Sequence, residues 1–326
     1  MKLHTDREMF SNAIQATSQE FVMAPEFVEK DYWICQVLQR LSRHPQSGRV
    51  VWKGGTSLSK AYGLIKRFSS DVDFAVLLDG LSQNQQKKLV GGIRRDTTAD
   101  MEELDMPEVT IKNNRFRKTY HGYKSVLSRR KENLDFLGNH VIVEINTYGN
   151  PHPYVRRAIK PFITEMMELR RLNSMIDELD MKPFELNVLD KRRTLCEKVV
   201  SLIRFSFEED SVAGVASKIR HFYDLYYLLL DSECMEYLNT VFPRDLIQLI
   251  GHDKAEFDRP PKWKTSDTLT SSLLVDFNSL WKKVSGTYKT EVGALSYGTI
   301  PTTDEIFESS SRLFNLVKRI LMSKIE

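Results

Sequence analysis

Two short apolar segments on either side of a Gly-Gly turn constrain the fold of this chain most strongly. Val50-Val51-Trp52 leads into Gly54-Gly55, and a second apolar segment begins with Asp71-Val72-Asp73. Hydrophobic periodicity predicts a strand near residues 49–53, a helix near 56–66 and a strand near 72–78. The stretch therefore predicts a strand–turn–helix–strand unit at the centre of the fold.

The second predicted strand places two carboxylates on one face of a sheet. Side chains at positions i and i+2 of a strand point the same way, so Asp71 and Asp73 lie close together. Two like charges this close repel each other unless a cation lies between them. Hard oxygen ligands suit Mg²⁺, which proteins hold with one or two carboxylates and substrate phosphates. The pair therefore predicts a Mg²⁺ site, with Mn²⁺ as an alternative.

The Gly-Gly turn predicts a phosphate-binding site beside that metal. The turn opens the predicted helix, and backbone N–H groups at the start of a helix bind phosphate. Phosphate binding beside a metal-binding carboxylate pair predicts nucleotidyl transfer from an NTP substrate. A P-loop NTPase is excluded, because its motif requires glycine at the position that Ser59 occupies.

Length, charge and cysteine content set the class of protein. The chain has 326 residues, enough for two domains, and its net charge of +3 permits a nucleic-acid partner without arguing for one. No secretory signal opens the sequence, and no apolar run approaches the ~20 residues of a membrane span. Cys35, Cys196 and Cys234 form no zinc or disulfide pattern. These features predict a cytoplasmic protein without a membrane partner.

The chain is expected to divide near residue 155. Residues 1–155 predict a nucleotidyltransferase domain with N-terminal helices, and residues 156–326 predict a mainly helical C-terminal domain. The β-branched run His140–Thr147 predicts a central strand, and it contains Glu144. Glu144 is either a third acid of the site or an edge-strand or core-paired residue, and Asn146 shares its face.

Two charged segments in the first half allow two interpretations each. Glu29–Trp33 is either an exposed charged turn with aromatic anchors or a segment whose Lys30 or Asp31 faces the nucleotide. Lys112–Lys118 is either a solvated hairpin loop or a contact to the phosphate backbone of an RNA.

Two polar residues stand out in the helical half. Lys198 flanks the apolar stripe of its helix, and it either reaches solvent or approaches a triphosphate. Asp224 lies in a nearly apolar helix and needs a partner. One interpretation is an ion pair with Arg220, one helical turn earlier. The other is a functional role, in which Asp224 either fixes Lys198 in place or acts on the attacking hydroxyl.

The pattern as a whole resembles a known family. Lys53–Tyr62 and Arg67–Phe74 resemble the AbiEii/AbiGii-type nucleotidyltransferase toxins of abortive-infection (phage-defence) and MenT-type toxin–antitoxin systems. The catalytic core of these toxins is similar to DNA polymerase β. Glu29–Trp33, Arg193–Lys198 and Arg220–Tyr226 follow in the family's order. The resemblance implies an α/β (α+β) fold, with a polymerase-β-like mixed sheet, flanking helices and a helical C-terminal domain.

The resemblance also assigns roles to residues. Its implied metal ligands are Asp71 and Asp73, and its essential later residues are Lys198 and Asp224. The phosphate-binding residues are Gly54, Gly55, Thr56 and Ser57, with added charge from Lys60 or Arg67. Glu144 is the candidate third catalytic and metal-binding acid, with Asn146 as the alternative.

The resemblance implies a reaction and its partners. It implies transfer of NMP to an acceptor, such as the 3′ end of a tRNA, which would block translation, and it implies a cognate antitoxin. Two alternatives stay open: the same fold with a protein acceptor or with phosphoryl transfer, and a non-catalytic nucleotide-binding interaction module.

Overall fold

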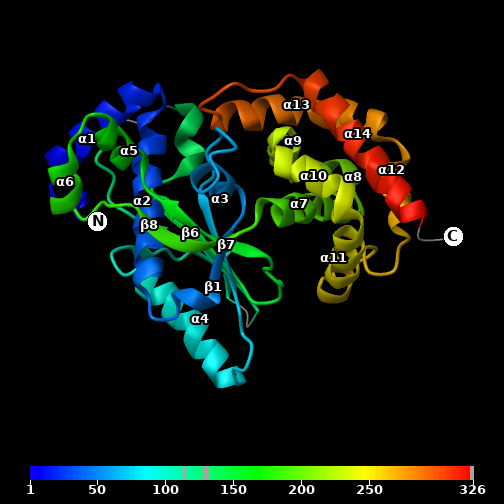
Figure 1. The fold of residues 1–326 in the computed structure, drawn as a ribbon, viewed down its shortest axis with the longest axis horizontal. Coiled ribbons are helices and arrows are strands. Elements are labelled where there is room, and N and C mark those ends of the chain that lie inside the picture. The colour runs from blue at the N-terminus through cyan, green and yellow to red at the C-terminus, as the bar shows by residue number, and fades with distance from the viewer. Residues whose placement is uncertain (113–114, 128–131, 324–326) are drawn as a thin grey trace. The chain divides into compact units, whose positions relative to one another are not determined.

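The chain forms two compact units. One short segment from the first half of the sequence belongs to the second unit. The computed structural model describes residues 1–112, 115–127 and 132–323, and Figure 1 shows its ribbon. The first unit comprises Met1–Gly63 and Phe68–Asp190. The second unit comprises Leu64–Arg67 and Lys191–Glu326. The four residues Leu64–Arg67, which lie between the Gly-Gly turn and Asp71 in sequence, therefore belong to the second unit.

A mixed eight-stranded sheet forms the centre of the first unit, which confirms the predicted α/β class. Its order is β3-β5-β6-β2-β1-β8-β7, and β4 pairs with β5. The strands are β1 (Val50–Lys53), β2 (Asp71–Val76), β3 (Glu102–Glu103), β4 (Ile111–Lys112), β5 (Phe116–Gly122), β6 (His140–Asn146), β7 (Tyr154–Ile159) and β8 (Phe184–Leu189). The pairs β2–β6 and β1–β8 are parallel, and the other pairs are antiparallel.

Helices cover one face of this sheet. The helices of the unit are α1 (Arg7–Phe21), α2 (Pro25–Arg43), α3 (Gly55–Lys60), α4 (Gln83–Thr97), α5 (Phe162–Leu169) and α6 (Asn173–Glu178). Both α2 and α4 contact β6, and Figure 1 shows α2 (blue) and α4 (cyan) beside the strands. Val72, Phe74, Val143 and Ile145 are buried, whereas the residues between them are partly exposed. This alternation leaves the opposite face of β2 and β6 for polar side chains.

The second unit is helical. Its helices are α7 (Lys191–Phe205), α8 (Ser211–Ala216), α9 (Arg220–Leu230), α10 (Ser232–Thr240), α11 (Phe242–Glu256), α12 (Ser272–Val275), α13 (Phe277–Leu295) and α14 (Thr303–Met322). Phe222 of α9 packs against Phe277, Trp281 and Phe314 in the core of the second unit. Short 3₁₀ helices occur in the first unit at Leu3–Thr5, Ser47–Arg49 and Glu132–Leu137, and in the second unit at Thr268–Thr270. None of the described helices combines the length and the apolar character that a membrane span requires.

Two expectations differ from the structure in their bounds. The division falls after Asp190, where 155 was expected, because β7 and β8 complete the sheet and β8 pairs with β1. The helix expected over residues 56–66 ends at Lys60. Gly63 then adopts a φ of +64°, and the chain leaves the first unit at Leu64.

Candidate active site

A row of four charged residues crosses the open face of the sheet. Cross-strand register pairs Lys53 of β1 with Asp73 of β2, Asp73 with Glu144 of β6, and Glu144 with Lys118 of β5. Residues paired in this way project to the same face. The row therefore runs positive, negative, negative, positive, and Asp71 lies two residues before Asp73 on that face. The sheet places Glu144 beside Asp73 and on the same face as Asp71.

The Gly-Gly turn lies against Asp73. Gly54 has a φ of +87° and a ψ of −170°, a backbone conformation that is almost confined to glycine. A Cβ atom at this position would lie 2.3 Å from Oδ2 of Asp73. Gly54 therefore serves two needs, because it permits the turn and leaves room for the carboxylate.

Negative charge accumulates at Asp73. Burial, the nearby carboxylates of Glu144 and Asp71, and a hydrogen bond with Glu144 raise the pKa of Asp73 well above its usual value, although Lys53 opposes this effect. Lys118 forms an ion pair with Glu144 at 2.9 Å and so neutralises one of the three carboxylates. The remaining charge is the kind that a bound cation relieves.

Asp71 and Asp73 suit a hard divalent cation. Both are carboxylates on one strand face, and burial together with the neighbouring carboxylates raises the pKa of Asp73. In the part of the chain that the structure describes, no group of three or more Asp, Glu, His or Cys side chains has a metal-binding arrangement. The fitting donor set is therefore the aspartate pair completed by substrate phosphates. Glu144 as a third ligand stays a prediction.

Hydroxyl groups fasten the Gly-Gly turn to β2. Thr56 Oγ1 donates a hydrogen bond of 2.7 Å to the carbonyl of Asp71, and Ser57 Oγ donates one of 2.8 Å to the carbonyl of Gly54. Both side chains are buried. The predicted phosphate-binding hydroxyls thus hold α3 against β2 and fix the turn.

Lys60 lies in a buried ion pair. Its ammonium is 3.0 Å from Asp31 and 3.6 Å from Glu165, and it lies 3.7 Å from the centre of the Phe162 ring. Asp31 also accepts a hydrogen bond from the backbone N–H of Phe162. Lys60, which the sequence proposes as a phosphate-binding charge, thus ties α3 to α2 and α5 in this structure.

The interpretation of Glu29–Trp33 as an exposed turn is wrong. All five residues are buried within α2. Glu29 accepts hydrogen bonds from Ser125 Oγ and the backbone N–H of Val126, and Lys30 donates to the carbonyl of Leu137. Burying these charges is favourable only because each has a partner. The segment therefore organises loops of the first unit.

In the helical unit, Asp224 of α9 joins two basic residues. Lys198 of α7 lies 2.7 Å from one carboxylate oxygen of Asp224, so the predicted pairing of these two residues is confirmed. Arg67 donates from Nε and Nη2 at 2.7 and 2.6 Å, whereas the intrahelical pairing with Arg220 considered from the sequence is not the arrangement observed. These cations hold the pKa of Asp224 below its usual value although burial opposes them. The carboxylate is therefore ionised, and charged donors engage both of its oxygen atoms.

Sequence comparison identifies the family. The model of the "Nucleotidyl transferase AbiEii toxin, Type IV TA system" family matches residues 36–309. This chain belongs to the AbiEii nucleotidyltransferase toxin family. MenT4, a nucleotidyltransferase toxin from Mycobacterium tuberculosis, has a similar structure, with a TM-score of 0.56 and 16% identity over 95% of this chain and 89% of that one. This likeness concerns the fold. No curated protein matches the sequence.

The structure places the AbiEii-type motifs in both units. The first unit holds Gly54, Gly55 and the carboxylates, and the second holds Arg67, Lys198 and Asp224. Sequence reasoning missed Lys53 and Lys118 as the ends of the charged row. Alternation in β1 and β5 was the available signal, but the register that aligns these strands depends on contacts distant in sequence.

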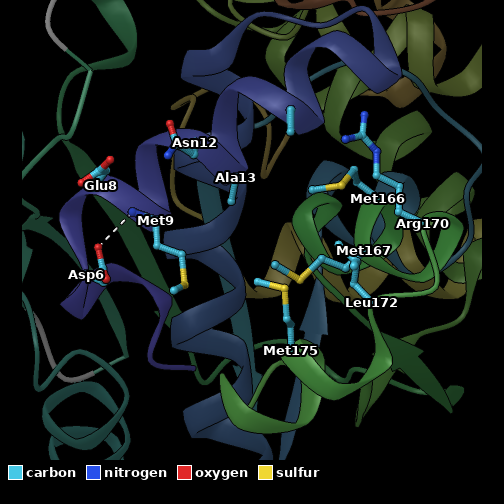
Figure 2. A pocket seen from close by; sticks show the side chains of 11 residues that line it. Asp6, Glu8, Met9, Asn12, Ala13, Met166, Met167, Arg170, Leu172 and Met175 are labelled. Carbon is cyan, nitrogen blue, oxygen red and sulfur yellow. Dashed lines mark hydrogen bonds between the residues drawn. The ribbon is translucent and has the colours of Figure 1, made fainter.

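A pocket of about 460 Å³ lies elsewhere in the first unit of this AbiEii-family chain. Figure 2 shows its lining from α1, α5 and α6, which includes Met9, Met166, Met167 and Met175. None of the predicted site residues is among its lining residues. The pocket is thus separate from the charged face of the sheet.

Proposed function

We propose that this protein transfers a nucleoside monophosphate from an NTP to the 3′ end of a tRNA and so blocks translation. Membership of a nucleotidyltransferase toxin family supports the reaction class. The observation that carries the proposal is the pair Asp71 and Asp73 on an open sheet face, in contact with the Gly54 turn.

The proposal includes a divalent cation held by Asp71 and Asp73, either Mg²⁺ or Mn²⁺. Such a cation, when bound, neutralises phosphate charge during in-line displacement at the α-phosphorus and departure of pyrophosphate. The two carboxylates supply the charge that selects the cation, and Lys118 offsets part of the charge that the neighbouring Glu144 adds. Mg²⁺ is the better match, because carboxylates and phosphates are its usual ligands.

The remaining residues of the charged face act on the triphosphate. Backbone groups of Gly54 and Gly55 can approach phosphate oxygens closely because glycine has no side chain of its own. Lys53 and Lys118, at the two ends of the charged row, attract a polyanion to the face between them. We expect Lys198 and Asp224 to be required for transfer, as the family pattern implies.

An RNA acceptor suits the basic residues around β4 and β5, of which Lys112 also pairs with Glu103 at 2.7 Å. Lys112 of β4 and Arg117 of β5 are register partners, and Arg115 is exposed before β5. Residues 113–114 of the predicted basic segment lie outside the described residues. Lys and Arg side chains supply the phosphate contacts that dominate nucleic-acid affinity. The proposal places this toxin in the cytoplasm with a cognate antitoxin, in keeping with its toxin–antitoxin family.

Labelled nucleotides test the reaction. Purified protein is incubated with Mg²⁺, total tRNA and each NTP labelled at the α- or the γ-phosphate, and the products are treated with RNase or protease. The proposal predicts α-label in RNase-sensitive material, abolished by Asp71→Ala and kept by Asp79→Asn, a control in the loop after β2. Protease-sensitive label would indicate a protein acceptor, and γ-label would indicate phosphoryl transfer.

Metal binding is tested apart from activity. Mg²⁺ should raise the melting temperature of the wild type and of Asp79→Asn, because a ligand that binds the folded state stabilises it. Asp73→Asn should remove most of this shift. Growth arrest on expression that persists in Asp73→Ala, with no label in any product, would support the non-catalytic module instead.

A further inference from the structure

Four residues that precede the metal-binding strand are built into the helical unit. Leu64–Arg67 lie between α3 and β2 in sequence but belong to the second unit. The backbone N–H of Tyr297 donates to the carbonyl of Lys66 at 2.9 Å, and Ser296 Oγ donates to the same carbonyl at 3.1 Å. Arg67 and Ser296 also form an antiparallel β-bridge. The segment is thus held along its backbone.

The packing around Lys66 is close. The backbone N–H of Lys66 donates to Tyr223 Oη at 3.3 Å. A Cβ atom on Gly298 would lie 2.6 Å from Cβ of Lys66, so glycine at 298 lets the two backbones approach. Tyr223 immediately precedes Asp224 on α9, so adjacent residues of one helix contact adjacent residues of the segment.

The Arg67–Asp224 contact is the strongest of these attachments. Arg67 uses two nitrogen atoms on two oxygen atoms of Asp224, a paired geometry that fixes direction as well as distance. The side chains of Asp224, Arg67 and Lys198 are 0%, 3% and 7% exposed. Removing one member of such a buried group leaves charge without compensation. The contact therefore holds strongly, and it joins residues 157 positions apart.

We propose that Asp224 is a positioning residue that holds Arg67, and through it the segment Leu64–Arg67 that leads into the metal-binding strand. β2 begins at Asp71, four residues after Arg67. Lys198 supports the same carboxylate from α7. This inference rests on the proposed function for its kinetic consequence, but the anchoring itself does not. It accounts for the expected requirement for Asp224, whose carboxylate is paired with Arg67 and Lys198, without a contact between Asp224 and the substrate.

Hydrogen exchange tests the anchor without any activity. Asp224→Asn keeps the side-chain volume and removes the charge, and it should raise the exchange rate of the amides of Lys66 and Tyr297 at least tenfold. Asp231→Asn is the matched control, because Asp231 is a helix cap paired with Lys191 at 2.7 Å in the same unit. Asp231→Asn should leave the exchange rates of those two amides unchanged. Unchanged exchange in folded Asp224→Asn would overturn the anchor.

A double-mutant cycle tests the positioning role. Arg67→Met and Asp224→Asn should each lower kcat by ~100-fold, because misplacing a reacting group by ~1 Å costs about that much. KM for the NTP should stay within threefold. The double variant should match the worse single variant, since both changes break one link.

A conservative change provides the rescue. Arg67→Lys can keep one of the two hydrogen bonds, so it should retain at least tenfold more activity than Arg67→Met and more protection of the Lys66 amide. Multiplicative losses in the double variant, or a rise in KM alone, would overturn the positioning role and give Asp224 a direct part in the reaction. If the wild type transfers no nucleotide, the proposed function fails, while the exchange measurement still decides the anchor.

Discussion

Gly54 is the residue at which the Gly-Gly turn meets Asp73 of β2. Its φ is +87°, and a Cβ atom added to it would lie only 2.3 Å from Asp73 Oδ2, so there is no room for a side chain. We expect Gly54→Ala to lower transfer by ~100-fold, because it must displace the Asp73 carboxylate. The measurement is kcat with the preferred NTP.

Gly63 provides the control for this prediction. Gly63 also has a positive φ, +64°, but a Cβ atom there meets nothing within 4 Å. Gly63→Ala should therefore carry a backbone cost of ~1–2 kcal/mol and leave kcat nearly unchanged. Equal loss of activity in the two variants would show that backbone strain, and not the contact with Asp73, explains the requirement for glycine.

Asp180 makes the stability of the first unit depend on pH. Hydrogen bonds from Arg43, together with the nearby N-terminal amine, lower the pKa of Asp180 from 3.8 to about 2. A lowered carboxyl pKa stabilises the fold above the unfolded value of 3.8, and this contribution is lost as the pH falls towards 2. Asp180→Asn should therefore destabilise the protein at pH ~7, with a smaller difference from wild type at pH ~3.

Urea unfolding at the two pH values measures this effect. Asp177→Asn is the control, because Asp177 forms an exposed ion pair with Lys182, and such pairs contribute little. A deficit in Asp180→Asn that is as large at the acidic pH as at the neutral one would contradict the role of its charge.

Single residues differ in how far the sequence predicts them. The shared face of Asp71 and Asp73 follows from local alternation in one strand. The need of a buried carboxylate for a cation predicts a basic partner for Asp224, but it leaves Arg220 and Lys198 as alternatives, and the structure selects Lys198. The contact between Arg67 and Asp224 cannot be predicted in this way, because no local sequence pattern shows that a residue before β2 will contact α9.

At the scale of elements, α3 is held by a buried ion pair. Lys60→Met should destabilise the protein by ~3–5 kcal/mol, because it leaves Asp31 buried without its cation. The double variant Asp31→Asn/Lys60→Met should recover part of this loss, since the amide oxygen of an asparagine at this position can still accept the backbone hydrogen bond of Phe162. Thermal or urea unfolding measures both values.

The same variants separate two roles of Lys60. If Lys60 acts only through Asp31, KM for the NTP should return towards the wild-type value in the double variant. A KM that stays raised in a double variant of recovered stability would show that Lys60 binds phosphate, as the sequence predicted.

The elements themselves were largely predictable. Asp6 caps α1, and Pro25 begins α2, which are local signals with local effects. The early end of α3 was missed because its apolar pattern continues through Leu64 and Ile65, and these residues serve the second unit instead. The burial of Glu29–Trp33 was missed because its partners, such as Ser125 and Leu137, are distant in sequence.

At the scale of the whole molecule, the division of the chain depends on pairing between distant strands. Residues 156–190 belong to the first unit because β8 lies parallel to β1, with Trp52 opposite Val188. Local periodicity reveals the strand near Leu186 but not its partner. The chain also enters the second unit at Leu64 and leaves it after Arg67. A substitution in α9 is therefore expected to act first on Leu64–Arg67, which the chain joins to the strand that begins at Asp71.

The most direct test of the central claim is the mass of the tRNA 3′ end. Total tRNA is incubated with Mg²⁺, each NTP and the wild-type protein, Asp73→Asn or Asp79→Asn, and terminal fragments are analysed by mass spectrometry. We predict that the wild type and Asp79→Asn add nucleoside monophosphate to the 3′ terminus with at least one NTP, and that Asp73→Asn adds none. Unmodified 3′ ends with every NTP and folded wild-type protein, or equal addition by Asp73→Asn, would contradict the account.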